Sequence, residues 1–400
     1  MNPTFKALLI IGIIGIIMVT CGCAGQRTGK SHTEITYQAE IMVIKEKGGR
    51  VDWSHTLNVV AFDKRGADGF YDIYLLNPDG SHERCLTCDT TSHHNGNPAW
   101  HPSGEWIVFQ SVDTALLPPI NPEEVNAYTN PGAGWLNNLW AMDDEGSTFY
   151  QLTSVGIKGG VLHPHFSHDG TELLWAERVE GDETGSTGTW ALKIADFTIT
   201  ENGPVIGNIQ SFTPGEQHAF YESHGFSFDD TRILFSGNLQ KDQPMYGLDI
   251  YELDLETQKL TPLTESFYEW DEHAHYSPDG QTIVWMSSAG YNVNPLRADF
   301  WLMDVDGSHK QQLTFFNESG HPHYRGVTVA ADSALGPDGN TIIAYIKTEC
   351  AGLGSEGSIV KIELKEKENF WVLTHNLVHI MFLALCAIIL GIYQNKMKGS

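Results

Sequence analysis

The chain has 400 residues, of which 50 are acidic and 24 are basic, so its formal net charge at pH 7 is −26. A surface this negative argues against nucleic acid and anionic lipid as partners and favours cations or basic partners. Acidity that serves only solubility remains an open alternative. The 40 glycines and the aromatic content of 11% are typical of many short strands joined by tight turns.

Residues 1–25 have the pattern of an export signal. Lys6 precedes an unbroken apolar run at 7–19, which is too short to span a membrane and is followed by small and polar residues. We therefore expect a signal peptide or a lipoprotein leader. Cys21 or Cys23 would carry the lipid in the second case, although the residues before each cysteine match the usual small-residue box poorly.

Residues 30–368 are built from repeats of one unit, about six copies, which predicts a single domain because repeated units bury their faces against their neighbours. Each copy has a strand ending in an aromatic residue, a tight turn, and a second strand with alternating polarity. The clearest copy is DEHAHYSPDGQTIVW at 271–285. The others are VDWSHTLNVVAF at 51–62, NPAWHPSGEWIVF at 97–109, LHPHFSHDGTELLW at 162–175, ESHGFSFDDTRILF at 222–235, and an interrupted copy that starts as HPHYRG at His321 and resumes as GPDGNTIIAY.

Four strand signals recur in each full copy, and the last ends in Leu-Thr or Phe-Thr. The sixth copy stops after its third strand, at 358–364, while a strand-like segment from Glu34 to Lys45 has no partner nearby. We expect that segment to fill the vacant place and close the ring, because closure removes exposed sheet edges. The predicted fold is an all-β six-bladed β-propeller closed by an amino-terminal strand.

The turn and strand pattern resembles that of the TolB-like six-bladed β-propellers. The resemblance covers the whole body and rests on the WHPSG, FSHDG, YSPDG and GPDG turns and on the IVF, LLW, IVW and IAY strands after them. It implies the fold and not the function, since this architecture serves periplasmic scaffolds, peptidase-associated domains and lyases alike. No TolB-type domain precedes the repeats, so we expect no role in the Tol envelope system.

Residues 370–393 carry no formal charge and are long enough for one membrane-spanning helix. Two lysines follow, which predicts a cytoplasmic tail at 394–400 and a propeller outside the cytoplasm, periplasmic or on the cell surface. Cys85 and Cys88 are the close cysteine pair of the body. In an oxidising compartment a local disulfide is favoured over a redox pair or half of a zinc site.

Histidines recur in two columns when the copies are aligned on the aromatic residue. The two rings of a His-x-His pair on a strand face the same side, about 7 Å apart, and we expect the pairs to converge near one mouth of the central channel. Imidazoles with a carboxylate suit manganese, zinc, iron or nickel. His224 falls one residue out of register, which could turn it away. The predicted metal ligands are His163, His165, Glu222, His224, His273, His275, His321 and His323.

Four more residues are candidates for ligand contacts. Asn97 stands in the first histidine column, Glu272 aligns with Glu222, and Arg297 or Arg325 could contact a carboxylate. An alternative without a metal also remains, in which the histidines plug the channel by hydrogen bonding to one another and to Asp271 and Glu272, or cap strand ends.

Two functions remain open at this point. One is a membrane-tethered binding or scaffold propeller, whose channel holds a metal or small ligand and whose loops meet an unknown protein or carbohydrate. The other is a metal-dependent lyase or hydrolase that uses the same histidines. A shell of four or more protein ligands favours the first function, and three ligands beside an open cleft favour the second.

The lyase hypothesis comes from a second resemblance. Some TolB-like propellers are oligogalacturonate lyases with manganese bound by channel histidines and a glutamine, and this chain is similar to them in its inner-strand histidines. The resemblance implies a metal that neutralises a uronate carboxylate while a base removes the neighbouring proton. No residue is assigned as that base. Serine hydrolysis is disfavoured because the chain has no GxSxG motif.

Overall fold

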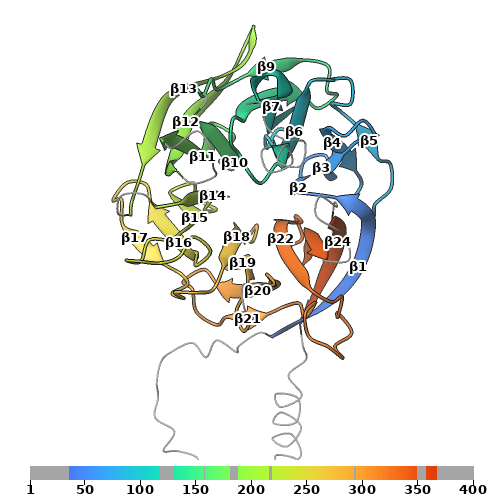
Figure 1. Cartoon of the computed structure of the whole chain (residues 1–400), viewed down its shortest axis with the longest axis vertical. Helices are drawn as coiled ribbons and strands as arrows, with labels where there is room; N and C mark the ends of the chain where they lie inside the picture. Colours follow the sequence, from blue (N-terminus) through green and yellow to red (C-terminus); the bar gives the residue numbers. More distant parts are fainter. Residues whose placement is uncertain are drawn as a thin grey trace, which may run out of the picture. The chain divides into compact units, whose positions relative to one another are not determined.

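The computed structural model describes residues 36–117, 129–156, 158–180, 188–215, 219–291, 294–348 and 357–366. Within these residues the chain forms six four-stranded antiparallel sheets, the blades, arranged around a central axis (Figure 1). The predicted all-β six-bladed propeller is confirmed. The predicted leader at 1–25 and the predicted helix at 370–393 lie outside the described residues, and the described part of the chain contains no helix long and apolar enough to cross a membrane.

The first strand of each blade lies innermost, and the others follow outward. Blades 1 and 2 are β2 (Val51–Ser54), β3 (Val59–Arg65), β4 (Tyr71–Leu76), β5 (Arg84–Cys85), and β6 (His93–Trp100), β7 (Trp106–Asp113), β8 (Asn138–Asp143), β9 (Phe149–Gln151). Blades 3 and 4 are β10 (Gly160–Phe166), β11 (Glu172–Glu180), β12 (Thr189–Thr200), β13 (Gly203–Phe212), and β14 (Tyr221–Phe226), β15 (Arg232–Gly237), β16 (Asp249–Asp254), β17 (Leu260–Pro262). Blades 5 and 6 are β18 (Asp271–Tyr276), β19 (Thr282–Ser287), β20 (Asp299–Asp304), β21 (Gln311–Gln312), and β22 (Thr328–Leu335), β23 (Thr341–Thr348), β24 (Gly357–Glu366), β1 (Tyr37–Gly48). A 3-10 turn, η1 (Thr114–Leu116), follows β7.

The ring closes through β1, which supplies the outermost strand of blade 6. It pairs antiparallel with β24, from Tyr37 opposite Glu366 to Gly48 opposite Gly357. In Figure 1 the two ends of the colour scale therefore lie side by side in one sheet. The predicted closing strand is confirmed: β1 pairs with the outer edge of β24 and joins the start of the propeller to its end.

Apolar side chains from both faces of each blade form the core between neighbouring blades. On β19, Trp285 packs with residues of blade 4, whereas Met286, one position on, packs with residues of blade 6. Successive side chains of a strand point to opposite faces, so a central strand with apolar residues at every position fills two interfaces at once. This arrangement explains the unbroken apolar triplets such as IVW that follow the turns.

The Leu-Thr endings join the third and fourth strands. In blade 5 the Thr314 hydroxyl donates to Asp299 Oδ1 at 2.8 Å and accepts the backbone N–H of Phe300 at 2.9 Å. The same pairing occurs between Thr87 and Asp72 in blade 1. Both partners are buried in each case, so the contact satisfies polar groups that would otherwise be unpaired. Cys85 and Cys88, beside the blade 1 pair, form a disulfide.

Candidate metal centre

A β-bulge interrupts the inner strands β6, β10, β14, β18 and β22 before their turns. In blades 2, 3, 5 and 6 two residues of the inner strand oppose one residue of the next strand, and blade 4 has a similar register shift. The first bulge residues Asn97, His163 and His273 have φ values of +53°, +49° and +52°. This left-handed backbone is unfavourable for residues other than glycine, and such strain is found at functional sites. The bulge re-aims side chains that a regular strand would direct elsewhere.

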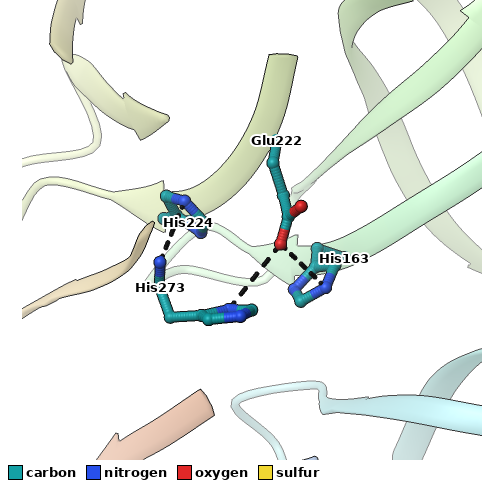
Figure 2. Close-up of side chains that lie close together, drawn as sticks. All are labelled: His163, Glu222, His224 and His273. Atoms are coloured by element: carbon teal, nitrogen blue, oxygen red, sulfur yellow. Dashed lines mark hydrogen bonds and ion pairs between the residues drawn. The ribbon is translucent and has the colours of Figure 1, made fainter. Parts of the chain in front are cut away.

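Four potential ligands meet inside the ring, and all are buried (Figure 2). His163 comes from β10, Glu222 and His224 from β14, and His273 from β18, and one ligand atom of each lies within 4.8 Å of those of the others. Glu222 Oε1 is 3.0 Å from His163 Nε2 and 3.6 Å from His273 Nδ1. Two ligands on one tetrahedral metal at about 2.1 Å are about 3.4 Å apart. The two Glu222 distances are close to this spacing, and the other pairs of ligand atoms lie within 4.8 Å.

Three atoms of this cluster lack a hydrogen-bond partner in the described part of the chain. They are Glu222 Oε1, His224 Nδ1 and His273 Nδ1, and each is inaccessible to solvent. Leaving a buried polar atom unpaired costs about 1–3 kcal/mol. A metal ion would accept lone pairs from all three, which is the chemistry that the donor set fits.

The other nitrogen of His224 is held by blade 4 and blade 5. His224 Nε2 lies 2.6 Å from the Ser236 hydroxyl and also receives the backbone N–H of His273 at 3.2 Å. Nδ1, the unpaired atom, has the lone pair only in the tautomer whose Nε2 proton goes to Ser236, and in that tautomer Nε2 no longer accepts the His273 N–H. Metal-binding histidines commonly use their second nitrogen in this way to fix the ring.

Two glutamates and one arginine set the charge of the cluster. Burial, together with the neighbouring charge of Glu272, raises the pKa of Glu222 well above its usual range, and burial raises that of Glu272 to about 7. Arg50 donates from Nε to His163 Nε2 at 3.4 Å and from its backbone N–H to Asp63 at 3.2 Å. The contact with His163 places the positively charged guanidinium of Arg50 next to the cluster.

The imidazoles of the cluster are neutral at neutral pH. Burial lowers the pKa of His163 and His224 well below the usual value, and it lowers that of His273 to about 3. Neutral imidazole is the form that binds metals, so the site is not blocked by protons on its histidines.

Next to this cluster, a cavity of about 140 Å³ opens at the channel mouth. Its lining includes His163 from the cluster and His165, His275 and Asp332. His275 Nε2 is 3.3 Å from Asp332 Oδ1, and the rings of His165 and His275 are 5.6 Å apart. Burial alone would raise the pKa of Asp332, but the hydrogen bond with His275 and the neighbouring His273, His275 and Arg50 side chains hold it at about 2. The channel thus has a closed layer and an open layer.

The structure brings six of the eight predicted metal ligands to the channel. His224 does not face away: its ring centre lies 5.7 Å from that of His273, because the bulge in β14 turns it inward. Among the other candidates, Asn97 lines the cavity, and Glu272 Oε2 lies 3.6 Å from His273 Nε2.

The placement of His321 and His323 on the inner strand of blade 6 was wrong. Both lie in the loop between β21 and β22, where His321 packs 4.4 Å from Phe315, centre to centre, and His323 donates to the Ala39 carbonyl in β1. Arg325 is in the same loop, Arg297 lies two residues before β20, and neither lines the channel cavity. The inner strand of blade 6 is β22 instead, because the turn Gly336–Gly339 directly follows it.

Asp332 was missed, although a signal for it is present in the sequence. It precedes Asp338 of its turn by six positions, as His163 precedes Asp169 and His273 precedes Asp279. Gln110 was also missed, because it lies on the second strand and not the first. Its Oε1 accepts the backbone N–H of His163 at 3.1 Å, which supports the bulge there.

Comparisons with known proteins identify the architecture. No protein-family model matches the chain. A curated protein similar in sequence is dipeptidyl-peptidase 5 of Porphyromonas gingivalis, 23% identical over 300 residues that cover 72% of this chain and 43% of the relative. The dipeptidyl-peptidase 5 of Porphyromonas endodontalis is 23% identical over 240 residues, covering 56% of this chain and 34% of that protein. The chain spans less than half the length of these relatives.

Solved structures that resemble this one include TolB from Acinetobacter baumannii, with a TM-score of 0.50 and 15% identity over 78% of this chain and 65% of that one. An oligogalacturonate lyase in complex with manganese gives a TM-score of 0.46 and 10% identity over 83% of this chain and 96% of that one. At such identities the TolB likeness shows the fold alone. The resemblance to TolB-like six-bladed β-propellers is thereby confirmed.

Proposed function

We propose that this protein is a TolB-like propeller that binds one divalent transition metal in its channel and acts outside the cytoplasm as a binding module for a protein or carbohydrate ligand. The observation that carries the proposal is the convergence of four buried ligand side chains from three blades, His163, Glu222, His224 and His273. Manganese, zinc, iron and nickel all accept such a nitrogen and oxygen donor set.

The role of this metal is structural. Four protein ligands complete a tetrahedral shell, and complete shells are typical of structural sites, whereas catalytic sites leave a position open. The ligands join β10, β14 and β18, so one ion would tie blades 3, 4 and 5 together at their inner ends. A metal bound only by the folded state stabilises it in proportion to its affinity.

The location outside the cytoplasm is part of the same proposal. It is supported by the export signal expected at 1–25 and the membrane helix expected at 370–393, with the propeller tethered to the membrane. The disulfide between Cys85 and Cys88 agrees with an oxidising compartment.

Metal analysis of the purified full chain is the direct test. We expect about one tightly held equivalent that survives desalting, and its loss in a variant with both His224→Gln and His273→Gln. The matched control carries His321→Gln and His323→Gln, which change two loop histidines and leave the bound metal in place. Equal metal content in the two double variants would refute the site.

The alternative function is a metal-dependent lyase or hydrolase acting on oligouronates. The cavity beside the metal cluster favours it, because His163 and His275 both line that cavity. The charge of the cavity disfavours it, since Asp52 and Asp332 are in the lining whereas the candidate Arg297 and Arg325 are not. Incubation with oligogalacturonate tests this alternative: a lyase releases an unsaturated product that absorbs in the ultraviolet, a hydrolase releases new reducing ends without that absorption, and a binding module releases neither.

A further inference from the structure

We infer that a cavity between blades 4 and 5, the blade 4–5 cavity, binds a basic side chain, arginine or lysine, of a polypeptide partner. This inference rests on the proposed function, because it names the ligand class of the binding module. It concerns a different part of the molecule from the metal centre, since none of the four proposed metal ligands lines this cavity. The two blades are neighbours in the ring (Figure 1).

The blade 4–5 cavity is large enough for a long side chain. Its volume is about 520 Å³, and small-ligand sites usually have about 300–1,000 Å³. Blade 4 contributes the segment that follows β17, and blade 5 contributes residues of β19, of β20 and of the turn after β20. A ligand in this cavity would therefore contact both blades.

Two indole rings supply the aromatic part of the lining. Trp285 and Trp301 are opposite each other on β19 and β20, and their ring centres are 6.0 Å apart. Trp285 donates from Nε1 to Asp271 Oδ1 at 3.2 Å, which fixes its ring. Trp301 is half-buried, and its Nε1 has no hydrogen-bond partner in the described part of the chain. Tryptophan is the aromatic side chain that attracts cations most strongly, so this lining suits a guanidinium or an ammonium group.

The lining has an excess of negative charge that the protein itself does not neutralise. Glu265 and Glu269 have no ion-pair partner among the described residues. The ammonium group of Lys310 donates to the Gly307 carbonyl and not to a carboxylate. The charged residues of the lining are four acidic and one basic, Glu265, Glu269, Asp271, Asp306 and Lys310. A cationic ligand would supply the missing counter-charge.

These carboxylates are too far apart to hold a metal ion. Among the described residues, none that lines the blade 4–5 cavity belongs to a group of three ligand atoms within 4.8 Å of one another. A metal ion requires such convergence. An arginine, by contrast, has N–H donors spread over a plane and can contact carboxylates that lie apart. The arrangement of charge therefore favours an organic cation.

Exposed aromatic side chains near the cavity favour a polypeptide as the source of that cation. The loop before β18 places Glu265 and Glu269 in the lining, and Tyr268 of the same loop is 74% exposed. Tyr246, in the loop before β16, is 62% exposed, and its ring centre lies 6.0 Å from that of Trp270. Tyrosine and tryptophan are enriched in protein–protein interfaces, where they contribute much of the binding energy.

A cavity at the equivalent place between blades 2 and 3 shows what is particular to the blade 4–5 cavity. Its volume is about 480 Å³, and it follows the Leu-Thr ending of blade 2 as the other follows that of blade 4. No aromatic residue is present among the described residues of its lining, and one carboxylate, Glu177, stands against Lys158 and Arg178. A cation would find neither indole rings nor an excess of negative charge there.

The experiment measures peptide binding to the full chain by isothermal titration calorimetry. The probe is a pentapeptide with blocked ends, in which two arginines alternate with glycines. Its matched control has citrulline in both places, which keeps the shape of arginine and removes the charge. We expect the wild type to bind one arginine peptide, less tightly as salt is added because salt screens the attraction, and not to bind the citrulline peptide.

Variants of the lining connect the binding to the cavity. Trp301→Leu should weaken the affinity about tenfold. Glu265→Gln combined with Glu269→Gln should weaken it and reduce its dependence on salt. The matched control combines Glu105→Gln and Glu201→Gln, which remove two exposed charges from turns of blades 2 and 3, and it should bind like the wild type. Circular dichroism and metal content, unchanged in each variant, show that the fold is intact.

Other outcomes overturn the inference, and the metal content separates its failure from that of the proposed metal centre. No binding of the arginine peptide, or equal binding of the citrulline peptide, refutes it even when the metal is present. Equal losses in the two double glutamine variants mean that only the overall charge attracts the peptide. Binding of maltohexaose, a neutral oligosaccharide, in place of the peptide means that the binding module takes a carbohydrate. Peptide binding without bound metal refutes the metal centre alone.

Discussion

Asp332 on β22 and His273 on β18 hold equivalent places in blades 6 and 5, and their side chains approach each other to 4.0 Å between Oδ1 and Nδ1. Each is a bulge residue, and each stands six positions before the aspartate of its own turn. The position six residues before the turn aspartate therefore delivers a carboxylate from one blade and an imidazole from the next. Repetition of a bulge around the ring creates the mixed donor set that divalent transition metals take.

Removal of the metal should destabilise the propeller. A metal present at about 100 times its dissociation constant adds about 2.7 kcal/mol to the free energy of unfolding, if it binds only the folded chain. We expect a chelator to lower the melting temperature of the wild type, and to have little effect on His224→Gln, which has lost a ligand. The exposed His82 has a φ of +58°, which asparagine tolerates, so His82→Asn is the control and should respond like the wild type. A chelator effect that persists in His224→Gln would contradict the assignment.

Arg50 should stabilise the metal-free protein by compensating buried carboxylates. Its charge acts on Asp63, Asp332 and Glu222. Arg50 is half-buried and its side chain donates to His163. A hydrogen bond made by a charged group contributes about 1.5–3 kcal/mol, so Arg50→Gln should lower the free energy of unfolding by about that amount in urea titrations with a chelator present. Bound metal should recover part of the loss, because it supplies positive charge at the same place.

The control for that measurement is Arg84→Gln. Arg84 pairs with Glu145 at 2.8 Å, and its side chain is 44% exposed. Exposed pairs contribute about 0–1 kcal/mol, so the two substitutions should differ several-fold. Equal effects would mean that the position of Arg50 near the channel has no energetic importance.

Thr314→Val should destabilise blade 5 without changing side-chain volume. The substitution leaves Asp299 Oδ1 without its hydroxyl donor and the Phe300 N–H without its acceptor, both buried. We expect a loss of about 1–3 kcal/mol. Thr148→Val makes the same change at an exposed turn, where Thr148 donates to Asp143 at 2.6 Å, and should cost less than about 0.5 kcal/mol. Urea unfolding curves of the two variants give the comparison, which fails if the exposed change is as costly.

Mild acid should destabilise the protein partly through His94. Burial, assisted by the charge of Arg65, lowers the pKa of this imidazole to about 4, against about 6.5 for an unfolded chain. The neutral form is favoured in the folded state, so the contribution is fully present above pH 6.5 and is lost as pH falls toward 4. His94→Asn should make the urea midpoint fall less steeply between pH 7 and pH 4.5 than it does in the wild type. A slope unaltered by His94→Asn would mean that this side chain takes up its proton without cost.

Local patterns were sufficient for the architecture. Each blade is formed by contacts between residues that are near one another in sequence. These contacts are made by the turns, the strands after them and the Leu-Thr endings, and their hydrogen bonding follows from residue type. The closing strand from Tyr37 was predictable for a different reason. The sixth repeat supplies only three strands, and the strand at the start of the body has no neighbour. Pairing the two is the arrangement that closes the ring.

The candidate site was predictable in part. Two alignment columns before the repeated turn contain histidines, so the convergence of these histidines follows from the repeat. They are His163, His165, His273 and His275. His321 and His323 have the same His-x-His spacing, but they are followed by a loop and not by the repeated turn. Counting back from Asp338 would have selected Asp332, because the bulge and the turn are one continuous piece of backbone.

The sequence by itself determined the number of blades, their order and the closure of the ring, since these depend on short-range turn chemistry and on alternation along each strand. Only the tertiary structure decided that His224 faces inward and that Arg50 lies against His163. The bulges beside these side chains contain the left-handed residues His163 and Gly225, and one added residue in a strand changes the direction of every side chain near it. The sequence pattern alone does not show in which direction a bulge turns these side chains.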